Sequence, residues 1–258
     1  MKLINSRTGI EMFYNERGEG KPHFVLIHGW TGNHTRWGKL PEMLSVDHHV
    51  IDYDLRGHSR SEKNISLDYG FSSHVMDLLG LLDVLSIDKA VICGHSMGGM
   101  IAQNFALAFP ERVEKLVLVA TASCMAPTPA DKKKLLATSF LFKYLFKAAM
   151  FIKNRDKADK TDLFPDMIDD SLSPISKSAS DSLVNISKMD LRERVRNLHI
   201  PTLVITTDTD KTINIKYAKE PASLIPGTKY VELKGLSHHI PLDDPDSTFN
   251  AIENFINE

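Results

Sequence analysis

Residues 91–103 read VICGHSMGGMIAQ, and this stretch decides the fold. An apolar run typical of a buried strand ends within it, and a pattern typical of a helix begins directly after Ser96. Residues 94–98, GHSMG, fit the pattern G-x-S-x-G, which at a strand–helix junction indicates a sharp turn that presents a serine hydroxyl. The glycines let the strand and the helix approach each other without Cβ clashes. Ser96 is therefore a candidate nucleophile.

This turn has two other possible interpretations. One is a glycine-rich turn with an idle serine, and the other is a phosphate-binding loop. A phosphate loop would need a G-x-G-x-x-G or a Gly-Lys-Ser/Thr pattern, and residues 91–103 contain neither. The position between a strand-like and a helix-like segment favours the nucleophile.

Strand-like and helix-like segments alternate on both sides of this turn. This alternation predicts an α/β fold, with a mostly parallel central sheet flanked by helices. The predicted strands cover residues 10–16, 23–29, 48–55, 90–93, 113–121, 201–207 and 229–235. The predicted helices cover residues 34–44, 72–87, 100–109, 216–225 and 247–257.

The alternation stops after the strand at 113–121 and resumes at the strand at 201–207. Between them lie a proline-containing loop, an apolar helix around residues 140–152 and a charged stretch, with no strand-like run. We predict a first part of the core at 1–122, a helical cap insertion at 123–197 and a second part of the core at 198–258.

The composition narrows the class of protein. With 258 residues, 42% of them hydrophobic and 25% charged, the chain can bury one large core. A net charge of −2 offers no basic field, so we expect no nucleic-acid partner. Cys93 and Cys124 form no disulfide framework, which favours a cytoplasmic location. The most apolar window, residues 135–153, carries Lys143 and Lys147, so we expect no membrane span.

A serine nucleophile needs a base and a group that orients the base. In a parallel sheet both should follow later strands, because the carboxyl ends of the strands meet at one edge. Asp208 and Asp210 follow the strand at 201–207, and His238 and His239 follow the strand at 229–235. The chain order is thus Ser, Asp, His.

These stretches resemble the α/β-hydrolase superfamily over nearly the whole chain, and most of all its capped serine esterases, lactonases and carbon–carbon hydrolases. The segments that carry the resemblance are LIHGWTGN (26–33), DLRGHSRS (54–61), residues 94–121, PTLVITTDTDKTI (201–213) and GLSHHIPLDDP (235–245). Three residues depart from the family pattern, since Ser59 replaces a glycine, Thr207 a glycine and Lys211 a proline. The resemblance implies a cap after the family's sixth strand, which corresponds to the strand predicted at 113–121 here.

The resemblance implies a role for each matched residue. Ser96 would attack a carbonyl carbon, His238 would act as the base, and Asp210, at the family's acid position, would orient His238. His238 is preferred to His239 because a proline follows it seven residues later. The backbone N–H groups of Trp30 and Met97 would form the oxyanion hole. No metal or organic cofactor is required for this chemistry.

A serine nucleophile also separates the chain from the epoxide hydrolases and dehalogenases of this fold, which use an aspartate. The sequence therefore suggests hydrolysis of a small, fairly apolar carboxylic ester through an acyl-enzyme, by a monomer or a homodimer. The alternatives are a carbon–carbon or enol-lactone hydrolase of aromatic degradation, and a non-catalytic ligand-binding protein on the same fold. Substrates of the first alternative carry carboxylates, for which the insertion offers Arg155, Arg192, Arg194 and Arg196. Candidate pocket residues are His95, Phe140, Tyr144, Leu145 and His239.

Overall fold

A computed structural model describes residues 1–64, 66–155 and 172–258, with the side chains of 142, 143, 145–155 and 172–176 left out of the description. The chain forms an eight-stranded sheet with the order β1-β2-β4-β3-β5-β6-β7-β8. The strands are β1 (Lys2–Ile4), β2 (Glu11–Arg17), β3 (His23–Ile27), β4 (His49–Tyr53), β5 (Ala90–His95), β6 (Val113–Val119), β7 (Thr202–Thr207) and β8 (Lys229–Leu233). The pairs β1–β2 and β2–β4 are antiparallel, and the other neighbouring pairs are parallel.

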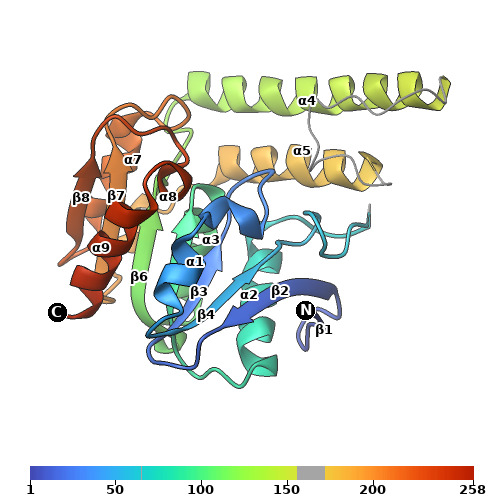
Figure 1. The fold of residues 1–258 in the computed structure, drawn as a ribbon. Helices are drawn as coiled ribbons and strands as arrows, with labels where there is room; N and C mark the ends of the chain where they lie inside the picture. The colour runs from blue at the N-terminus through green and yellow to red at the C-terminus, as the bar shows by residue number, and fades with distance from the viewer. Residues whose placement is uncertain (65, 156–171) are drawn as a thin grey trace.

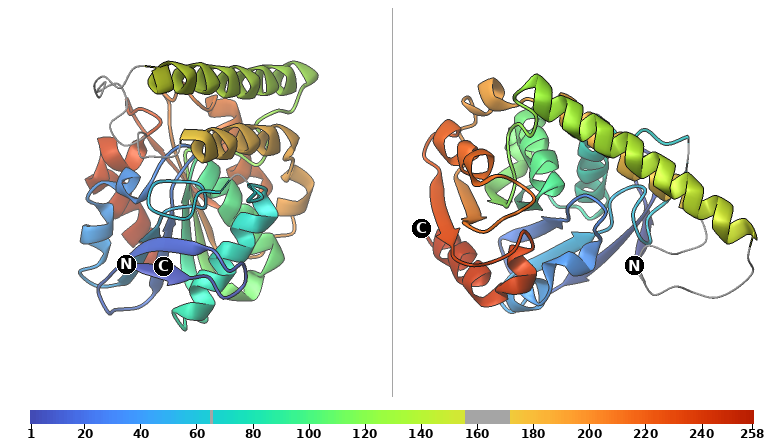
Figure 2. Two further views of the ribbon diagram at one scale, coloured as in Figure 1. Left: turned by 90° about the vertical axis from the view of Figure 1, so that its right-hand side faces the viewer. Right: turned by 90° about the horizontal axis from the view of Figure 1, so that it is seen from above.

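Helices cover both faces of the sheet, as Figures 1 and 2 show. They are α1 (Leu40–Leu44), α2 (Phe71–Val84), α3 (Met97–Ala108), α4 (Pro129–Arg155), α5 (Leu172–Lys188), α6 (Arg192–Val195), α7 (Ile215–Leu224), α8 (Ile240–Asp243) and α9 (Pro245–Ile256), with short 3-10 turns η1 (His34–Trp37) and η2 (Pro110–Arg112). These bounds confirm the predicted α/β fold with a mostly parallel sheet.

The two faces of the sheet belong to two apolar clusters because successive strand residues point to opposite sides. In β3, Val25 and Ile27 pack in the cluster that contains α2 and α3. Phe24 and Leu26 pack instead in the cluster that contains α1 and α9. Strands buried on both faces read as continuous apolar runs, which is why β3 and β5 were recognisable in the sequence.

Helices α4 and α5 follow β6, above the sheet in Figure 1, and α4 is the outer of the two. They are joined by the Ser139 hydroxyl, which donates to the carbonyl oxygen of Ser180 at 2.9 Å. The two ends of the insertion meet where Cys124 forms a β-bridge with Asp190. The described residues between β6 and β7 contain no strand, and the division of the chain into core and cap stays a prediction.

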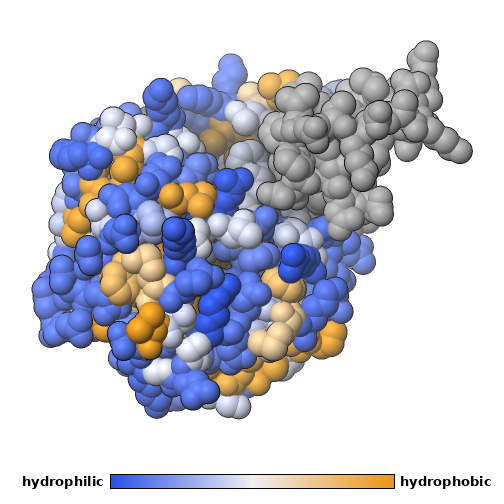
Figure 3. Space-filling view, in the orientation of Figure 1, coloured by the Kyte–Doolittle hydropathy of each residue, from blue (hydrophilic) through white to orange (hydrophobic). Residues whose placement is uncertain are grey.

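The structure differs from the sequence-based expectation in four places. Strand β1 was not predicted, and neither was the short helix α8 in the histidine loop. The single predicted helix at 34–44 is split into η1 and α1 by Gly38, which has a φ of 58°. Helix α4 begins at Pro129, well before the predicted apolar segment. No described helix is long and apolar enough to span a membrane, and Figure 3 shows a mostly hydrophilic face with separate small apolar areas.

A buried ion pair holds the loop that follows β4. The Arg56 guanidinium donates two hydrogen bonds of 2.6 Å to the Asp77 carboxylate of α2 and a third, of 2.8 Å, to the carbonyl oxygen of Asp68. Thr8 donates to the same carboxylate at 2.7 Å. Both charged side chains are almost completely buried. Removing one partner of such a pair leaves a buried charge uncompensated, which is strongly destabilising.

Three buried histidines lie beside this ion pair, and burial lowers the pKa of each. The pKa of His28 falls to about 3, that of His58 is lowered, and that of His74 lies well below 6.5. His28 donates from Nδ1 to the Gly29 carbonyl oxygen and accepts at Nε2 from the Leu55 N–H. Among the described residues, neither ring nitrogen of His74 has a hydrogen-bond partner. These imidazoles are therefore neutral in the folded protein.

Replacing His74 by leucine tests this conclusion, because leucine keeps a similar size without a titratable group. As the pH falls below about 6.5, the unfolded chain protonates His74 while the folded chain does not, so stability is lost on acidification. Each such histidine contributes about 1.4 kcal/mol per pH unit to this loss. We expect the free energy of unfolding in urea to fall less steeply from about pH 7 to about pH 5 in His74→Leu than in the wild type. Equal slopes would contradict this prediction.

Candidate active site

The turn that carries Ser96 lies between β5 and α3. Ser96 has φ 55° and ψ −119°, a conformation that residues other than glycine adopt only when their surroundings enforce it. Its N–H donates to the Val119 carbonyl oxygen at 2.9 Å, and its own carbonyl oxygen accepts from the Thr121 hydroxyl at 2.7 Å. Ser96 is the partly exposed residue in a buried turn, so its hydroxyl can be reached from outside.

Two glycines make this turn possible. A Cβ at Gly94 would lie 2.4 Å from the carbonyl oxygen of Gly98, and a Cβ at Gly98 would lie 2.1 Å from the carbonyl oxygen of Ile27. Both distances are far below van der Waals contact, and the blocking atoms are backbone atoms that cannot rotate away. Any side chain at these positions would therefore push strand, helix and serine apart.

The structure brings His238 and Asp210 together from the loops after β8 and β7. His238 donates from Nδ1 to Oδ2 of Asp210 at 2.7 Å. Oδ1 of Asp210 accepts from the N–H groups of Thr212 and Ile213 at 2.7 and 3.0 Å. With the proton on Nδ1, Nε2 of a neutral His238 is free to accept one.

The charge of Asp210 is held by its neighbours. Burial alone would raise the pKa of this carboxyl, but the hydrogen bond and charge of His238 and the two backbone N–H groups keep the pKa below its usual value. The side chain is only 2% exposed. Asp208 lies outside this arrangement, because it is exposed and accepts from the Gly235 N–H at 2.9 Å.

His95 connects the serine turn to the histidine loop. Its Nε2 donates to the His238 carbonyl oxygen at 2.8 Å, and its ring centroid lies 4.9 Å from that of His238. Burial, followed by the charge of His238, lowers the pKa of His95 to about 3, so the ring is neutral. Among the described residues no hydrogen bond joins the Ser96 hydroxyl to His238, as is common in sites without bound substrate. His95 nevertheless fixes their loops against each other.

His239, the second candidate base, points elsewhere. Its ring lies 5.6 Å from His238 and 5.9 Å from His95, centroid to centroid. No carboxylate accepts from its ring among the described residues, and its Nδ1 is buried without a partner. Burial, with the neighbouring His238, lowers its pKa. The structure thus gives an orienting carboxylate to His238 and none to His239.

The loop after β3 lies directly against the serine. A Cβ at Gly29 would be 3.0 Å from the Cβ of Ser96, so a side chain at residue 29 would crowd the serine. Trp30 follows Gly29, and the loop closes through a 3.1 Å hydrogen bond from the Gly32 N–H to the Gly29 carbonyl oxygen. On the other side, Met97 begins α3, and the first N–H groups of a helix have no partner within it. Of the two predicted donors, Met97 therefore follows Ser96 in the chain, and Trp30 follows a glycine that lies against Ser96.

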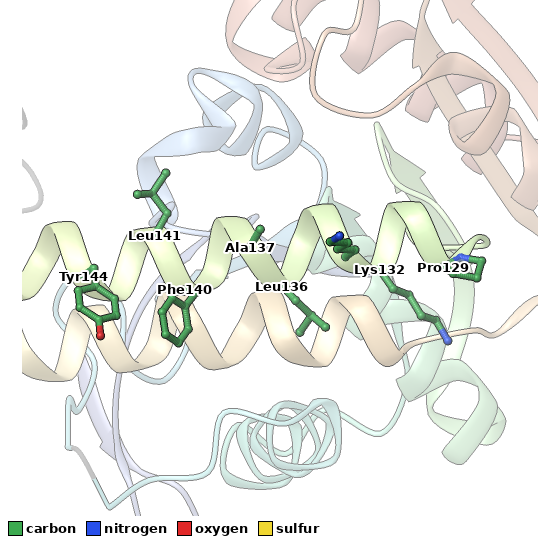
Figure 4. A pocket seen from close by; sticks show the side chains of 8 residues that line it. Pro129, Lys132, Leu136, Ala137, Phe140, Leu141 and Tyr144 are labelled. Carbon is green, nitrogen blue, oxygen red and sulfur yellow. The ribbon is translucent and has the colours of Figure 1, made fainter.

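The candidate pocket residues of α4 are placed differently. Phe140 and Tyr144 are 63% and 60% exposed, and their rings are in contact, tilted by 41° with centroids 5.0 Å apart. Together with Leu136 they project from one side of α4 in Figure 4. The groove that they line is completed by residues of the same helix: Pro129, Lys132, Lys133, Ala137 and Leu141. Ser96, Asp210 and His238 do not line it, and the side chain of Leu145 lies outside the described residues.

Two of the four arginines proposed for a carboxylate substrate form ion pairs elsewhere. Arg192 pairs with Asp190 at 2.6 Å, and Arg196 pairs with Glu193 at 3.7 Å. The side chain of Arg155 lies outside the described residues. Sequence reasoning missed two contacts near the serine, the bond from His95 to the His238 carbonyl and that from the Trp30 indole to the Ala179 carbonyl. Neither leaves a sequence signal, because both acceptors are backbone atoms.

In the part of the chain that is described, no cluster of three or more His, Cys, Asp or Glu residues could hold a metal ion.

Comparison with known proteins agrees with this architecture. A putative carbamate hydrolase of Pseudomonas syringae is 28% identical over 91% of this chain and 93% of its own length. A pimeloyl-[acyl-carrier protein] methyl ester esterase of Aliivibrio fischeri is 27% identical over 96% and 98%. A 2-hydroxy-6-oxononadienedioate/2-hydroxy-6-oxononatrienedioate hydrolase of Pseudomonas putida is 30% identical over 83% and 80%.

The fold is shared with solved structures as well. The crystal structure of an enol-lactonase from Burkholderia xenovorans superposes with a TM-score of 0.81 at 24% identity, over the full length of both chains. The model of a family described as the alpha/beta hydrolase fold matches residues 22–141, which include β3, β5 and the serine turn. Taken with the relatives that align along most of their own length, these matches show that the chain belongs to the α/β-hydrolase family, and that it is a hydrolase.

Proposed function

We propose that this protein is a serine hydrolase that cleaves a small, fairly apolar carboxylic ester through an acyl-enzyme. The observation that carries the proposal is the 2.7 Å hydrogen bond between His238 and Asp210, on loops that His95 holds beside Ser96. A serine in an enforced turn, a histidine with one nitrogen free and a carboxylate on the other nitrogen are the parts of a catalytic triad.

The proposed reaction begins when Oγ of Ser96 attacks the carbonyl carbon and Nε2 of His238 takes the hydroxyl proton. Asp210 keeps the proton on Nδ1 and stabilises the imidazolium that forms. The carbonyl oxygen becomes an oxyanion, for which the N–H groups of Trp30 and Met97 are the proposed donors. Collapse expels the alcohol, which receives the proton from His238 and leaves the acyl group on Ser96. A water molecule, deprotonated by His238, then attacks the acyl carbon. The bond to Oγ of Ser96 breaks, His238 returns the proton to Oγ, and the acid is released.

Two observations support an ester as the substrate. One relative that aligns over nearly its whole length is named as a methyl ester esterase. Trp30, which follows the glycine loop, packs against the apolar cluster that contains Met97 and Leu183 of α5. We therefore propose that the apolar part of the substrate lies beside Trp30 rather than along Phe140 and Tyr144, which are exposed. A cytoplasmic location and a monomer or homodimer remain predictions.

A carbon–carbon or enol-lactone hydrolase is the second candidate, favoured by the 30% identical relative. The name of that relative describes a dioate, and a dianionic substrate would need a cation near the serine. We propose Arg36 for this role, because its Cγ would lie 3.1 Å from a Cβ at Gly32 of the glycine loop. Its charge also acts on His239, where it is one of the causes, after burial and His238, that lower the pKa.

Covalent labelling tests the serine-hydrolase proposal directly. A fluorophosphonate probe reacts with an activated serine, so the wild type should be labelled stoichiometrically at Ser96. Ser96→Ala should be unlabelled, while its melting temperature should stay close to that of the wild type. Mass spectrometry of the labelled peptide identifies the site. A wild-type protein that takes up no probe would be a binding protein instead, and the proposal would be wrong.

The choice of base is tested by the two neighbouring histidines. His238→Ala should lower kcat by about four to six orders of magnitude, because the base, its tautomer control and its proton transfer are lost together. His239→Ala serves as the matched control, and its effect on kcat should be about tenfold or less. Steady-state kinetics on a p-nitrophenyl ester measures both. A larger loss in His239→Ala than in His238→Ala would reverse the assignment.

The class of substrate is tested by competition between two chemistries. Short and long p-nitrophenyl esters should be turned over, and a vinylogous diketone with a carboxylate should be turned over slowly or not at all. Turnover of the diketone alone would establish the second candidate. In that case Arg36→Met should raise KM for the diketone while it leaves KM for an uncharged ester unchanged.

A further inference from the structure

The side chain of Trp30 reaches from the glycine loop to the insertion. Its indole Nε1–H donates to the carbonyl oxygen of Ala179 in α5 at 2.9 Å, a contact between residues 149 positions apart. A helical carbonyl has a second lone pair beyond the one that its own helix uses, so it can accept this bond without loss of helical structure. The residue proposed as an oxyanion donor is thus tied through its side chain to a different part of the chain.

Helix α5 is in turn fixed to the core on both sides of this contact. Lys177 donates to the carbonyl oxygen of Leu67 at 3.1 Å, and its ammonium group lies 5.0 Å from the ring centroid of Tyr69. Asn185 donates to the carbonyl oxygen of Tyr69 at 3.2 Å. These bonds hold α5 at two points, two residues before and six residues after Ala179.

The closest approach lies one residue from Ala179. A Cβ at Gly57, which has a φ of +73°, would be 2.6 Å from Oγ of Ser178 and 2.4 Å from the ring of Tyr69. Helix α5 therefore sits as close to the loop after β4 as a glycine allows. The position of the Ala179 carbonyl is set by the core and does not depend on α4 alone.

The backbone of Trp30 has little freedom of its own. Thr31, with φ 55°, donates from its hydroxyl to the Trp30 carbonyl oxygen at 2.7 Å. The preceding Gly29 carbonyl oxygen accepts from His28 and Gly32. The Trp30 N–H belongs to the same rigid peptide plane as the Gly29 carbonyl, so the bonds to that carbonyl set its direction. The bond from the indole to α5 holds the Cα of Trp30, at the end of that plane, in place against the insertion.

We propose that Trp30 is a positioning residue, whose indole uses the docked helix α5 to hold its own backbone N–H in place for the developing oxyanion. This inference rests on the proposed function. It assigns α5 a role in the chemistry, because the insertion then helps to fix one donor of the oxyanion hole. Donors that are already oriented cost no reorganisation when charge develops, so this restraint acts on the transition state rather than on substrate binding.

Trp30→Phe removes the indole N–H and keeps an aromatic ring. We expect kcat to fall by about ten- to a hundredfold, less than the loss of a whole oxyanion donor, with KM changed by about twofold or less. A boronic acid adds to the Ser96 hydroxyl to form a tetrahedral adduct, so its affinity should fall by the same factor as kcat. Trp37→Phe is the matched control, because Trp37 is the other tryptophan and its buried indole nitrogen has no partner among the described residues. This variant should keep kcat.

A second variant covers the case in which Trp30→Phe does not fold. In the Trp37→Phe background Trp30 is the remaining tryptophan. Growth of a tryptophan auxotroph on benzothienylalanine then replaces Trp30 by an isostere whose sulfur cannot donate. Loss of kcat and of boronate affinity with unchanged KM in this protein supports the proposal.

The results distinguish a failure of the proposed role of Trp30 from a failure of the proposed function. If kcat and boronate affinity are unchanged, or if KM rises by the whole of the loss, Trp30 does not act on the oxyanion and this inference is wrong. If the wild type neither hydrolyses esters nor binds the boronic acid, the proposed function itself is wrong.

Discussion

The rest of the site depends on one steric constraint, the contact between Gly98 and the carbonyl of Ile27. A side-chain atom at residue 98 would lie 2.1 Å from that oxygen, so helix α3 can approach β3 only without one. This approach brings Ser96 to the edge of the sheet where β3 also ends. A loop that leaves β3 there passes within contact distance of the serine. Ser96 and the proposed oxyanion donors are thus neighbours because the backbone of α3 packs directly against that of β3.

The remaining groups are fixed to this point by polar contacts, two of which end on backbone carbonyls. His95 reaches forward to the His238 carbonyl, and Trp30 reaches across to the Ala179 carbonyl. Arg56 and Asp77 hold the loop on which α5 rests. Each contact joins segments that are far apart in the sequence, and each is buried or partly buried, where an unmet hydrogen bond is costly. The loops around the serine therefore support one another.

The sequence allowed prediction of the sheet and the serine turn, because each leaves a local pattern, while the His238–Asp210 pair was predicted from the resemblance to the α/β-hydrolase superfamily. Continuous apolar runs mark buried strands, and glycines at fixed spacing mark the turn. The placement of α4 could not be predicted in the same way. Its apolar residues suggested a pocket, yet Phe140 and Tyr144 lie on an exposed face. Periodicity shows that a helix has an apolar side, but it does not show which part of the protein packs against that side. The contacts of His95 and Trp30 could not be predicted from the sequence, because their acceptors are backbone carbonyl oxygens, which every residue carries.

The chain places Ser96 before the insertion and both Asp210 and His238 after it, on loops that follow the last two strands. During synthesis the serine turn can form as soon as β3, β5 and β6 are available, since its restraints come from Ile27, Val119 and Thr121. His238 and Asp210 arrive only with the final fifth of the chain. On the proposed mechanism, an incomplete polypeptide therefore carries a shaped serine turn without the base that would activate it. Hydrolysis would begin only once the C-terminal strands have joined the sheet.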